Sequence, residues 1–144
     1  DPPEALTSSE GWDTIKNREF LKEVITELKK HPIRVSIFVD TRQEMIRAAR
    51  ETGTDRVELY TEPYAKNYPY GPEKAVHGFV EAAKVAGEVG LGLNAGHDLN
   101  LQNLHFFYQN IPGLLEVSIG HALISDALYL GLENTIRMYK NQLT

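Results

Sequence analysis

The stretch RVSIFVD, residues 34–40, is the part of the chain that decides the fold. Its odd-numbered residues are apolar, whereas its even-numbered residues are polar or charged apart from Phe38. Because successive side chains of a β-strand point to opposite faces, this strand would be apolar on one face and mainly polar on the other. Strands of a doubly wound parallel sheet usually read as near-continuous apolar runs. The pattern therefore favours a barrel in which the polar face lines the lumen.

Strands are predicted at four places along the chain, and helical patterns lie between them. We expect strands at residues 33–39, 56–60, 91–94 and 116–119. Helical spacing of apolar residues, with helix-starting and helix-stopping residues, predicts helices at 14–30, 41–53, 71–90 and 101–110, and from about Ser125 to the end. The tyrosine- and proline-rich segment 60–70 is predicted to be a loop packed by its own aromatic side chains, with a lid or a subunit contact as the alternative.

Helices that alternate with strands predict parallel strand pairing with right-handed crossovers, which defines an α/β protein. A complete TIM (β/α)8 barrel needs at least about 200 residues, so the 144 residues here suffice for half of one, with four strand-helix units. We predict that residues 1–144 form a single unit. The residues expected on the lumen face are Arg34, Ser36, Glu58, Asn94 and Ser118.

The composition excludes several classes of protein. The formal net charge is −5 without a basic block, which argues against a broad nucleic-acid or membrane-surface footprint. The chain has no cysteine, which excludes disulfide frameworks, zinc ribbons and thiol nucleophiles. No run of apolar residues is long enough to predict a membrane span, and no charged-then-apolar signal pattern opens the chain. Because the sequence begins with Asp-Pro-Pro rather than Met, we expect that residue 1 is not a native start.

Glu58 lies in the middle of a predicted strand, between the apolar residues Val57 and Leu59. An unpaired carboxylate at such a position would be penalised by desolvation. One interpretation is a buried ion pair, for instance with Arg34 on the neighbouring strand, and the other is a functional acid or base. The two interpretations are compatible.

The segment GLNAGHDLN, residues 92–100, ends a predicted strand with small residues and then presents His97. Barrel enzymes keep catalytic groups at the C-terminal ends of their strands, and small residues let a ligand approach the backbone. This pattern predicts a catalytic histidine. The alternative is a histidine that bonds loop carbonyls beside a helix cap at Asn100.

The segment SIGHALI, residues 118–124, repeats this design on the next strand, with Gly120 and then His121 ahead of a helix. Unpaired N–H groups at the start of a helix suit a phosphate, and the loops after the last barrel strands are a frequent phosphate site. A tight turn without a ligand is the alternative.

Four blocks of the chain carry a resemblance to a known family. They are RVSIFVD (34–40), DRVELYTEPYA (55–65), LNAGHDLN (93–100) and EVSIGHALISDALYLGLE (116–133). In this order they resemble the pyridoxine 5′-phosphate synthase family, and the opening PEALTSSEGWD (3–13) looks like the segment after that family's fourth strand. The resemblance covers nearly the whole chain and implies the C-terminal half of a (β/α)8 barrel.

The resemblance also implies an activity. The family condenses 1-deoxy-D-xylulose 5-phosphate with 3-amino-2-oxopropyl phosphate to give pyridoxine 5′-phosphate, phosphate and water, the ring-closing step of vitamin B6 synthesis, and no cofactor is implied. By position, His97 matches the proton donor, and Glu58 matches a lumen carboxylate that assists proton movements or stabilises charged intermediates. The implied substrate-binding residues are Thr7, Asp98, Gly120 and His121.

These substrate-binding residues have different implied contacts. Thr7 would contact the deoxyxylulose phosphate, whereas Gly120 and His121 would bind the phosphate of the aminoketone substrate. Asp98 would contact that same substrate through its backbone, because this position is glycine in some members. The family's two proton acceptors, a histidine and a glutamate on earlier strands, have no counterparts in this sequence. The family is cytoplasmic and forms an octamer of barrels, so the implied partners are small phosphorylated molecules and further copies of the protein.

Two other hypotheses are consistent with the same residues. Glu58, His97 and His121 could converge as a two-histidine, one-carboxylate metal site, as in metal-dependent aldolase or epimerase barrels. A half-barrel could instead be inactive, pair through exposed strand edges, and bind phosphorylated ligands without turnover.

Overall fold

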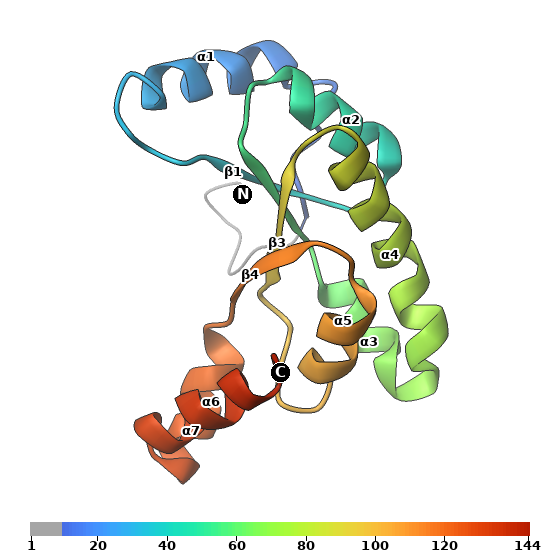
Figure 1. Ribbon diagram of the computed structural model, residues 1–144, viewed down its shortest axis with the longest axis vertical. Helices are drawn as coiled ribbons and strands as arrows, with labels where there is room; N and C mark the ends of the chain where they lie inside the picture. The colour runs from blue at the N-terminus through green and yellow to red at the C-terminus, as the bar shows by residue number, and fades with distance from the viewer. Residues whose placement is uncertain (1–9) are drawn as a thin grey trace.

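The structure, a computed structural model, describes residues 10–144 and contains one sheet of four parallel strands (Figure 1). The strands are β1 (Ser36–Val39), β2 (Arg56–Leu59), β3 (Gly92–Gly96) and β4 (Leu114–Ser118), and they lie in this order across the sheet. The prediction of an α/β chain with four parallel strands is confirmed. Four strands joined by helical crossovers are what half of a (β/α)8 barrel contains.

Helices occupy the connections between the strands. Within residues 10–144 they are α1 (Arg18–Leu28), α2 (Gln43–Glu51), α3 (Glu62–Asn67), the 3-10 helix η1 (Tyr68–Tyr70), α4 (Pro72–Glu88), α5 (Leu104–Asn110), α6 (His121–Leu130) and α7 (Leu132–Asn141). In Figure 1, α2 and α4 run along one face of the sheet, whereas α6 and α7 contact each other and extend beyond β4. No helix of this part of the chain is both long and apolar enough to cross a membrane.

The hydrophobic core lies between the sheet and the helices. Ile37, Val57 and Leu93 are neighbours across three strands, and each is at most 4% exposed. Ile46 of α2 and Phe79 of α4 belong to the same apolar cluster. Burying a side chain of this size fully contributes about 1.5–3 kcal/mol. The apolar face of the strand pattern is therefore the face that the helices cover.

The other face of the sheet is polar, as the alternation predicts. Glu58 is the Cα partner of Asn94, and Asn94 is the Cα partner of Glu116, so these three side chains share one layer. Arg34 and Arg56 both donate to Oε2 of Glu116, at 2.9 and 3.0 Å. The five residues predicted for the lumen face alternate with buried core residues along the strands. They are Arg34, Ser36, Glu58, Asn94 and Ser118.

The segment 60–70, predicted to be a loop, forms α3 and η1, so that prediction is wrong. Pro63 lies in the first turn of α3, where the fixed φ and missing N–H of proline are tolerated. Tyr64 is fully buried, and its hydroxyl donates to the carbonyl O of Asn103 at 2.7 Å. Its ring contacts that of Tyr68, with centroids 5.4 Å apart. The predicted packing by the segment's own aromatic rings is present, but it supports a helix.

The helix predicted from Ser125 to the end is two helices. The first, α6, begins four residues earlier, at His121, and Gly131 separates it from α7. Gly131 has a φ of +80°, which glycine adopts without a steric penalty. Because Leu128 and Leu132 keep helical spacing across this glycine, the apolar pattern does not reveal the break.

The first helix begins later than predicted. Asp13 accepts a hydrogen bond from the N–H of Lys16 at 2.8 Å, which is the contact expected of a capping residue. This bond closes a separate turn, and α1 begins only at Arg18.

Candidate active site

Three predicted site residues lie near the C-terminal ends of neighbouring strands. Glu58 is the third residue of β2, His97 directly follows β3, and His121 begins α6 three residues after β4. The rings of His97 and His121 are in contact, with centroids 5.9 Å apart and planes inclined by 66°. The structure therefore brings together two segments that sequence patterns single out independently, one for a catalytic histidine and one for a phosphate site.

Asp98 accompanies His97 in this cluster. Nδ1 of His97 lies 3.1 Å from Oδ2 of Asp98, and the two atoms form an ion pair whenever the imidazole is protonated. Both side chains are about one-quarter exposed, so a small molecule can reach them. A carboxylate beside one ring nitrogen restrains the orientation of the imidazole, which proton transfer to a positioned substrate requires.

Thr61, two residues after the end of β2, holds the turn that carries His97. Its fully buried hydroxyl donates to the carbonyl O of Gly96 at 2.8 Å and accepts from the N–H of Asp98 at 3.2 Å. The carbonyl O of Asp98 accepts from Asn103 at 3.4 Å. Both backbone groups of Asp98 are thus used within the chain, and a substrate contact through the Asp98 N–H requires the bond to Thr61 to be shared or released.

Glu58 has a raised pKa because its charged form is destabilised. Burial is the largest cause, the negative charge of Glu116 adds to it, and His97 opposes it. Among residues 10–144 no side chain forms an ion pair with Glu58, and the predicted partner Arg34 binds Glu116 instead. The prediction of a Glu58–Arg34 ion pair is therefore wrong. Burial and the charge of Glu116 thus favour the protonated carboxyl at Glu58 more than in an ordinary glutamate.

Arg56 organises the layer beside Glu58. Its Nη1 donates both to Oδ1 of Asn94, at 2.9 Å, and to Oε2 of Glu116, at 3.0 Å. The sequence patterns do not single out Arg56, Glu116 or Thr61. The period of two along the strands could have found the first two, because Arg56 precedes Glu58 by two residues and Glu116 precedes Ser118 by two.

Gly120 precedes α6 and His121 is its first residue, so the helix start lies directly at the two residues predicted to bind phosphate. The carbonyl O of Gly120 accepts the first helical bond, from Ile124 at 3.0 Å, and the N–H groups of the first turn point away from the helix. Gly120 has a φ of −104°, which any residue adopts, and a Cβ built there meets no atom within 4 Å. The space that a side chain at Gly120 would occupy is therefore open at the start of α6.

Gly96 is required by packing. A Cβ at this position would overlap the carbonyl oxygen of Ser118 on the neighbouring strand. The close approach of β3 and β4 at this level brings the residue after Gly96, which is His97, near the start of α6.

The remaining predictions on the site have different outcomes. Within residues 10–144 no group of three histidine or carboxylate side chains converges as metal ligands, so the arrangement of Glu58, His97 and His121 does not favour the metal-dependent hypothesis. Thr7 lies outside the described residues.

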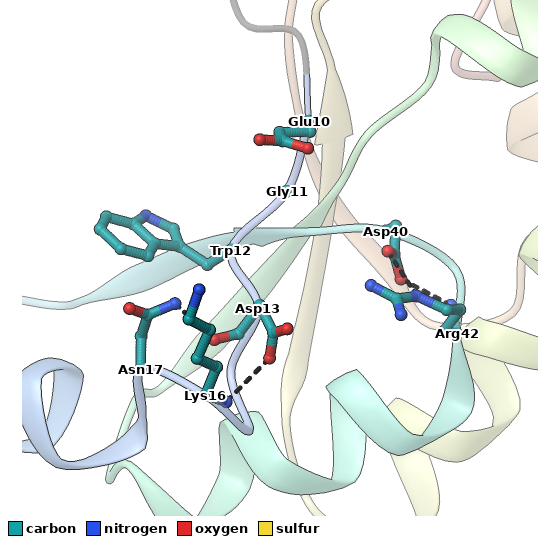
Figure 2. A pocket seen from close by; sticks show the side chains of 8 residues that line it. All are labelled: Glu10, Gly11, Trp12, Asp13, Lys16, Asn17, Asp40 and Arg42. Carbon is teal, nitrogen blue, oxygen red and sulfur yellow. Dashed lines mark hydrogen bonds and ion pairs between the residues drawn. The ribbon is translucent and has the colours of Figure 1, made fainter. Parts of the chain in front are cut away.

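A cavity of about 570 Å³ lies beside the end of β1 and the start of α1 (Figure 2). Its lining residues are Glu10, Gly11, Trp12, Asp13, Lys16, Asn17, Asp40 and Arg42. Lys16 and Arg42 share this lining with three carboxylates, and Arg42 is paired with Asp40 at 2.8 Å. None of the predicted site residues lines this cavity, and its mixed charge selects no class of ligand.

Parallel strands whose C-terminal ends gather two histidines, a carboxyl with a raised pKa and a helix N-terminus fit the class of (β/α)8-barrel proteins. The comparison with protein families makes this class specific. The family model for the pyridoxal phosphate biosynthesis protein PdxJ matches residues 1–144, and the chain belongs to this family.

Two similar proteins are both named pyridoxine 5′-phosphate synthase. The chain is 63% identical to the pyridoxine 5′-phosphate synthase of Flavobacterium johnsoniae over 139 residues, which are 96% of this chain and 59% of that protein. It is 62% identical to the enzyme of the same name from Bacteroides thetaiotaomicron over 141 residues, which are 98% of this chain and 60% of that protein. The family resemblance predicted from the sequence is confirmed, and the chain spans about 60% of the length of these relatives.

Proposed function

We propose that this chain supplies the C-terminal strand-helix units of a pyridoxine 5′-phosphate synthase. The reaction condenses 1-deoxy-D-xylulose 5-phosphate with 3-amino-2-oxopropyl phosphate and gives pyridoxine 5′-phosphate, phosphate and water. The observation that carries the proposal is the contact of His97 with both Asp98 and His121 at the strand ends that also carry Glu58.

The chemistry of this reaction suits the residues of the site. Condensing an amine with a ketone, expelling phosphate and closing a ring require proton transfers at several atoms. His97 is the proposed proton donor, because its ring is restrained by Asp98 and reachable from outside. Glu58 is the proposed lumen carboxyl that moves protons or stabilises charged intermediates. Burial raises the pKa of Glu58, so the group exchanges its proton closer to neutral pH than an ordinary glutamate does.

The start of α6 is the proposed phosphate site. Its first N–H groups and the positive end of the helix dipole favour an anion, and His121 adds a donor. The open space at Gly120 lets a phosphate approach these donors. Thr7 and the backbone of Asp98 are proposed to complete substrate binding.

The whole protein is proposed to need more than this chain. The two proton acceptors that the family resemblance implies have no counterparts in these 144 residues. We propose that turnover needs a longer polypeptide, that the barrels assemble with further copies of themselves, and that the enzyme works in the cytoplasm without a cofactor.

The test uses a polypeptide of the relatives' length that contains residues 1–144, called the full-length polypeptide below. Supplied with both phosphorylated substrates, it should release inorganic phosphate and form pyridoxine 5′-phosphate in equal amounts, and omission of either substrate should abolish both. The 144-residue chain alone should show no turnover. Binding of phosphorylated ligands by the full-length polypeptide without any product would contradict the proposal and favour the hypothesis of an inactive binding protein.

A further inference from the structure

Two aromatic side chains interrupt the polar face of the sheet. Phe38 of β1 and Tyr60, which directly follows β2, lie on that face because they alternate with the buried Val39 and Leu59. Their rings are in edge contact, with centroids 5.5 Å apart and planes inclined by 68°. Both side chains are half-buried, and neither belongs to the apolar cluster that packs against the helices. The Phe38–Tyr60 pair is thus a separate aromatic surface.

The Phe38–Tyr60 pair borders the candidate active site. Phe38 is the Cα partner of Glu58, and Tyr60 follows Glu58 by two residues on the same face. Burial and two nearby carboxylates, one of them Asp98, raise the pKa of the Tyr60 hydroxyl. Because Asp98 also contacts His97, the aromatic surface and the histidine cluster lie at the same end of the sheet.

The other two strands contribute only small side chains at this level. Gly96 is paired with Ser118 and cannot carry a Cβ without overlapping the backbone of Ser118. At this level β3 and β4 therefore contribute nothing larger than serine, whereas the contacting rings of Phe38 and Tyr60 belong to β1 and to the residue after β2.

We infer that the Phe38–Tyr60 pair binds the aromatic ring of pyridoxine 5′-phosphate and of the late intermediates that lead to it. The inference rests on the proposed function. Aromatic rings favour offset-stacked or edge-to-face neighbours, and a planar ring can meet the pair in either way. On this face the Phe38–Tyr60 pair offers a half-buried apolar surface next to carboxyl and histidine groups, which suits a ligand with an aromatic ring and polar substituents. The site then has two parts, since the start of α6 binds the phosphate and the Phe38–Tyr60 pair binds the ring.

The experiment separates these two parts with two probes. Binding of pyridoxine 5′-phosphate, which has a ring and a phosphate, and of glycerol 3-phosphate, which has only a phosphate, is measured by calorimetry on the full-length polypeptide. Phe38→Leu and Tyr60→Leu should each weaken the binding of pyridoxine 5′-phosphate by about 3- to 10-fold, the usual worth of one aromatic contact. Binding of glycerol 3-phosphate should stay within about twofold, since no ring contact is lost.

Three variants serve as controls. Tyr60→Phe keeps the ring and should bind pyridoxine 5′-phosphate nearly as tightly as the unsubstituted protein. Tyr70→Leu should change neither affinity, because Tyr70 lies on η1 and is 90% exposed. His121→Asn should weaken both probes, because the phosphate is common to them.

The outcomes distinguish this inference from the proposed function. Unchanged affinity for pyridoxine 5′-phosphate in both leucine variants would overturn the inference while leaving the proposed function intact. Equal losses for both probes would assign the pair to general stability of the site and would also overturn it. Failure of the unsubstituted protein to bind pyridoxine 5′-phosphate or to form it would overturn the proposed function and the inference together.

Discussion

At the scale of single residues, His97 is the group most fully engaged in the site. The carboxylate of Asp98 and the ring of His121 both contact it, and its strand-end position is one that barrel enzymes use for catalysis. A histidine that only closed a loop would not need a reachable neighbour at the start of a separate helix.

We expect His97→Ala to lower the turnover of the full-length polypeptide by about 10²- to 10⁴-fold, the usual range for a positioned acid or base. The fold should persist, because the side chain is partly exposed and is not part of the core. Initial rates of phosphate release are the measurement. His77→Ala is the matched control, since His77 is exposed on α4 and should be replaceable without loss. A rate within about threefold of the unsubstituted protein would return His97 to a structural role.

Glu58 makes a prediction about stability and pH. Its folded-state pKa is raised above the ordinary value of 4.5, so its contribution to stability is present below that value and is lost as the pH rises through the folded-state pKa. Glu58→Gln should therefore raise the free energy of unfolding at neutral pH, and the gain should shrink as the pH falls below 4.5. Urea unfolding of the 144-residue chain across this range measures the difference.

Glu133→Gln is the control for this measurement, because the Glu133 side chain is 91% exposed and its removal should leave stability nearly unchanged at every pH. A Glu58→Gln protein that is less stable at neutral pH would mean that the ionised carboxylate has a stabilising partner.

The ion-pair partner of a strand residue is harder to predict from the sequence than the face of the sheet on which the residue lies. Alternation along β1 and β2 correctly placed Arg34 and Glu58 on one face, but Arg34 reaches across the sheet to Glu116 on β4. Side-chain reach of this kind depends on strand order and register, which a single sequence does not define. The alternation of polar and apolar residues therefore could not predict which arginine pairs with which glutamate on this face.

At the scale of elements, the site depends on how the end of β2 is tied to the turn after β3. Thr61 makes this link with a single buried hydroxyl, which contacts backbone atoms on both sides of His97. The link is local in space but joins residues that are far apart in sequence, so periodicity could not reveal it.

Thr61→Val should destabilise the protein by about 1–3 kcal/mol, because the buried carbonyl of Gly96 and the N–H of Asp98 lose their partner. Thr61→Ser keeps the hydroxyl and should recover most of this loss. Urea unfolding of both variants gives the free energies. Equal stability of Thr61→Val and the unsubstituted protein would show that these backbone groups find other partners.

The start of α6 makes a prediction about the order of two effects. Most of its attraction for phosphate comes from backbone N–H groups, so His121→Asn should weaken phosphate-ligand binding modestly, by about 3- to 10-fold. Gly120→Val should weaken binding more severely, because its side chain would enter the open space at the start of α6. Gly120 has a φ of −104° and a ψ of −80°, so urea unfolding of this variant is measured as well, to separate lost binding from lost stability.

Calorimetric titration of the full-length polypeptide with pyridoxine 5′-phosphate tests this order. A Gly120→Val protein that binds as tightly as the unsubstituted one would show that the phosphate lies elsewhere. Gly87→Val is the control, because it adds the same side chain on α4, away from α6, and should leave binding unchanged. Gly113→Val is unsuitable because Gly113 has a φ of +71°, where valine would be strained.

Strands were easier to predict from the sequence than helix boundaries. All four strands lie where alternating or apolar runs predicted them, because a sheet buried on one face imposes a period of two. The segment around Tyr64 was mistaken for a loop because its prolines are typical of turns, whereas the burial of Tyr64, which stabilises α3, depends on tertiary packing. Gly131 was missed because the apolar spacing continues across it.

At the scale of the whole molecule, the sheet is open. In the order β1-β2-β3-β4, the first and last strands are the edges, and the helices at both ends leave apolar side chains in water. Leu128 and Tyr129 of α6 are 81% and 88% exposed, and Phe20 of α1 is 54% exposed. The family resemblance implies that the polar face lines the lumen of a complete barrel. Half of a barrel was predictable from the sequence because 144 residues and four strands each correspond to about half of a (β/α)8 barrel.

The exposed apolar side chains at the ends of the sheet predict that the chain associates with itself. Among residues 10–144 the outer edge of β4 has no paired strand, whereas Trp12 donates to the carbonyl O of Phe38 at the β1 edge. An unpaired strand edge and apolar helix faces favour association, so the 144-residue chain alone should form dimers or larger species as its concentration rises. Leu128→Glu should weaken this association by about tenfold or more, because a buried leucine contributes about 1.5–3 kcal/mol and a buried carboxylate opposes burial. Lys84→Glu, which changes an exposed side chain on α4, is the control and should leave association unchanged. Sedimentation velocity over a range of concentrations measures the species present. A chain that stays monomeric at every concentration would show that its edges are protected without a partner, whereas association that Leu128→Glu leaves untouched would place the contact away from α6.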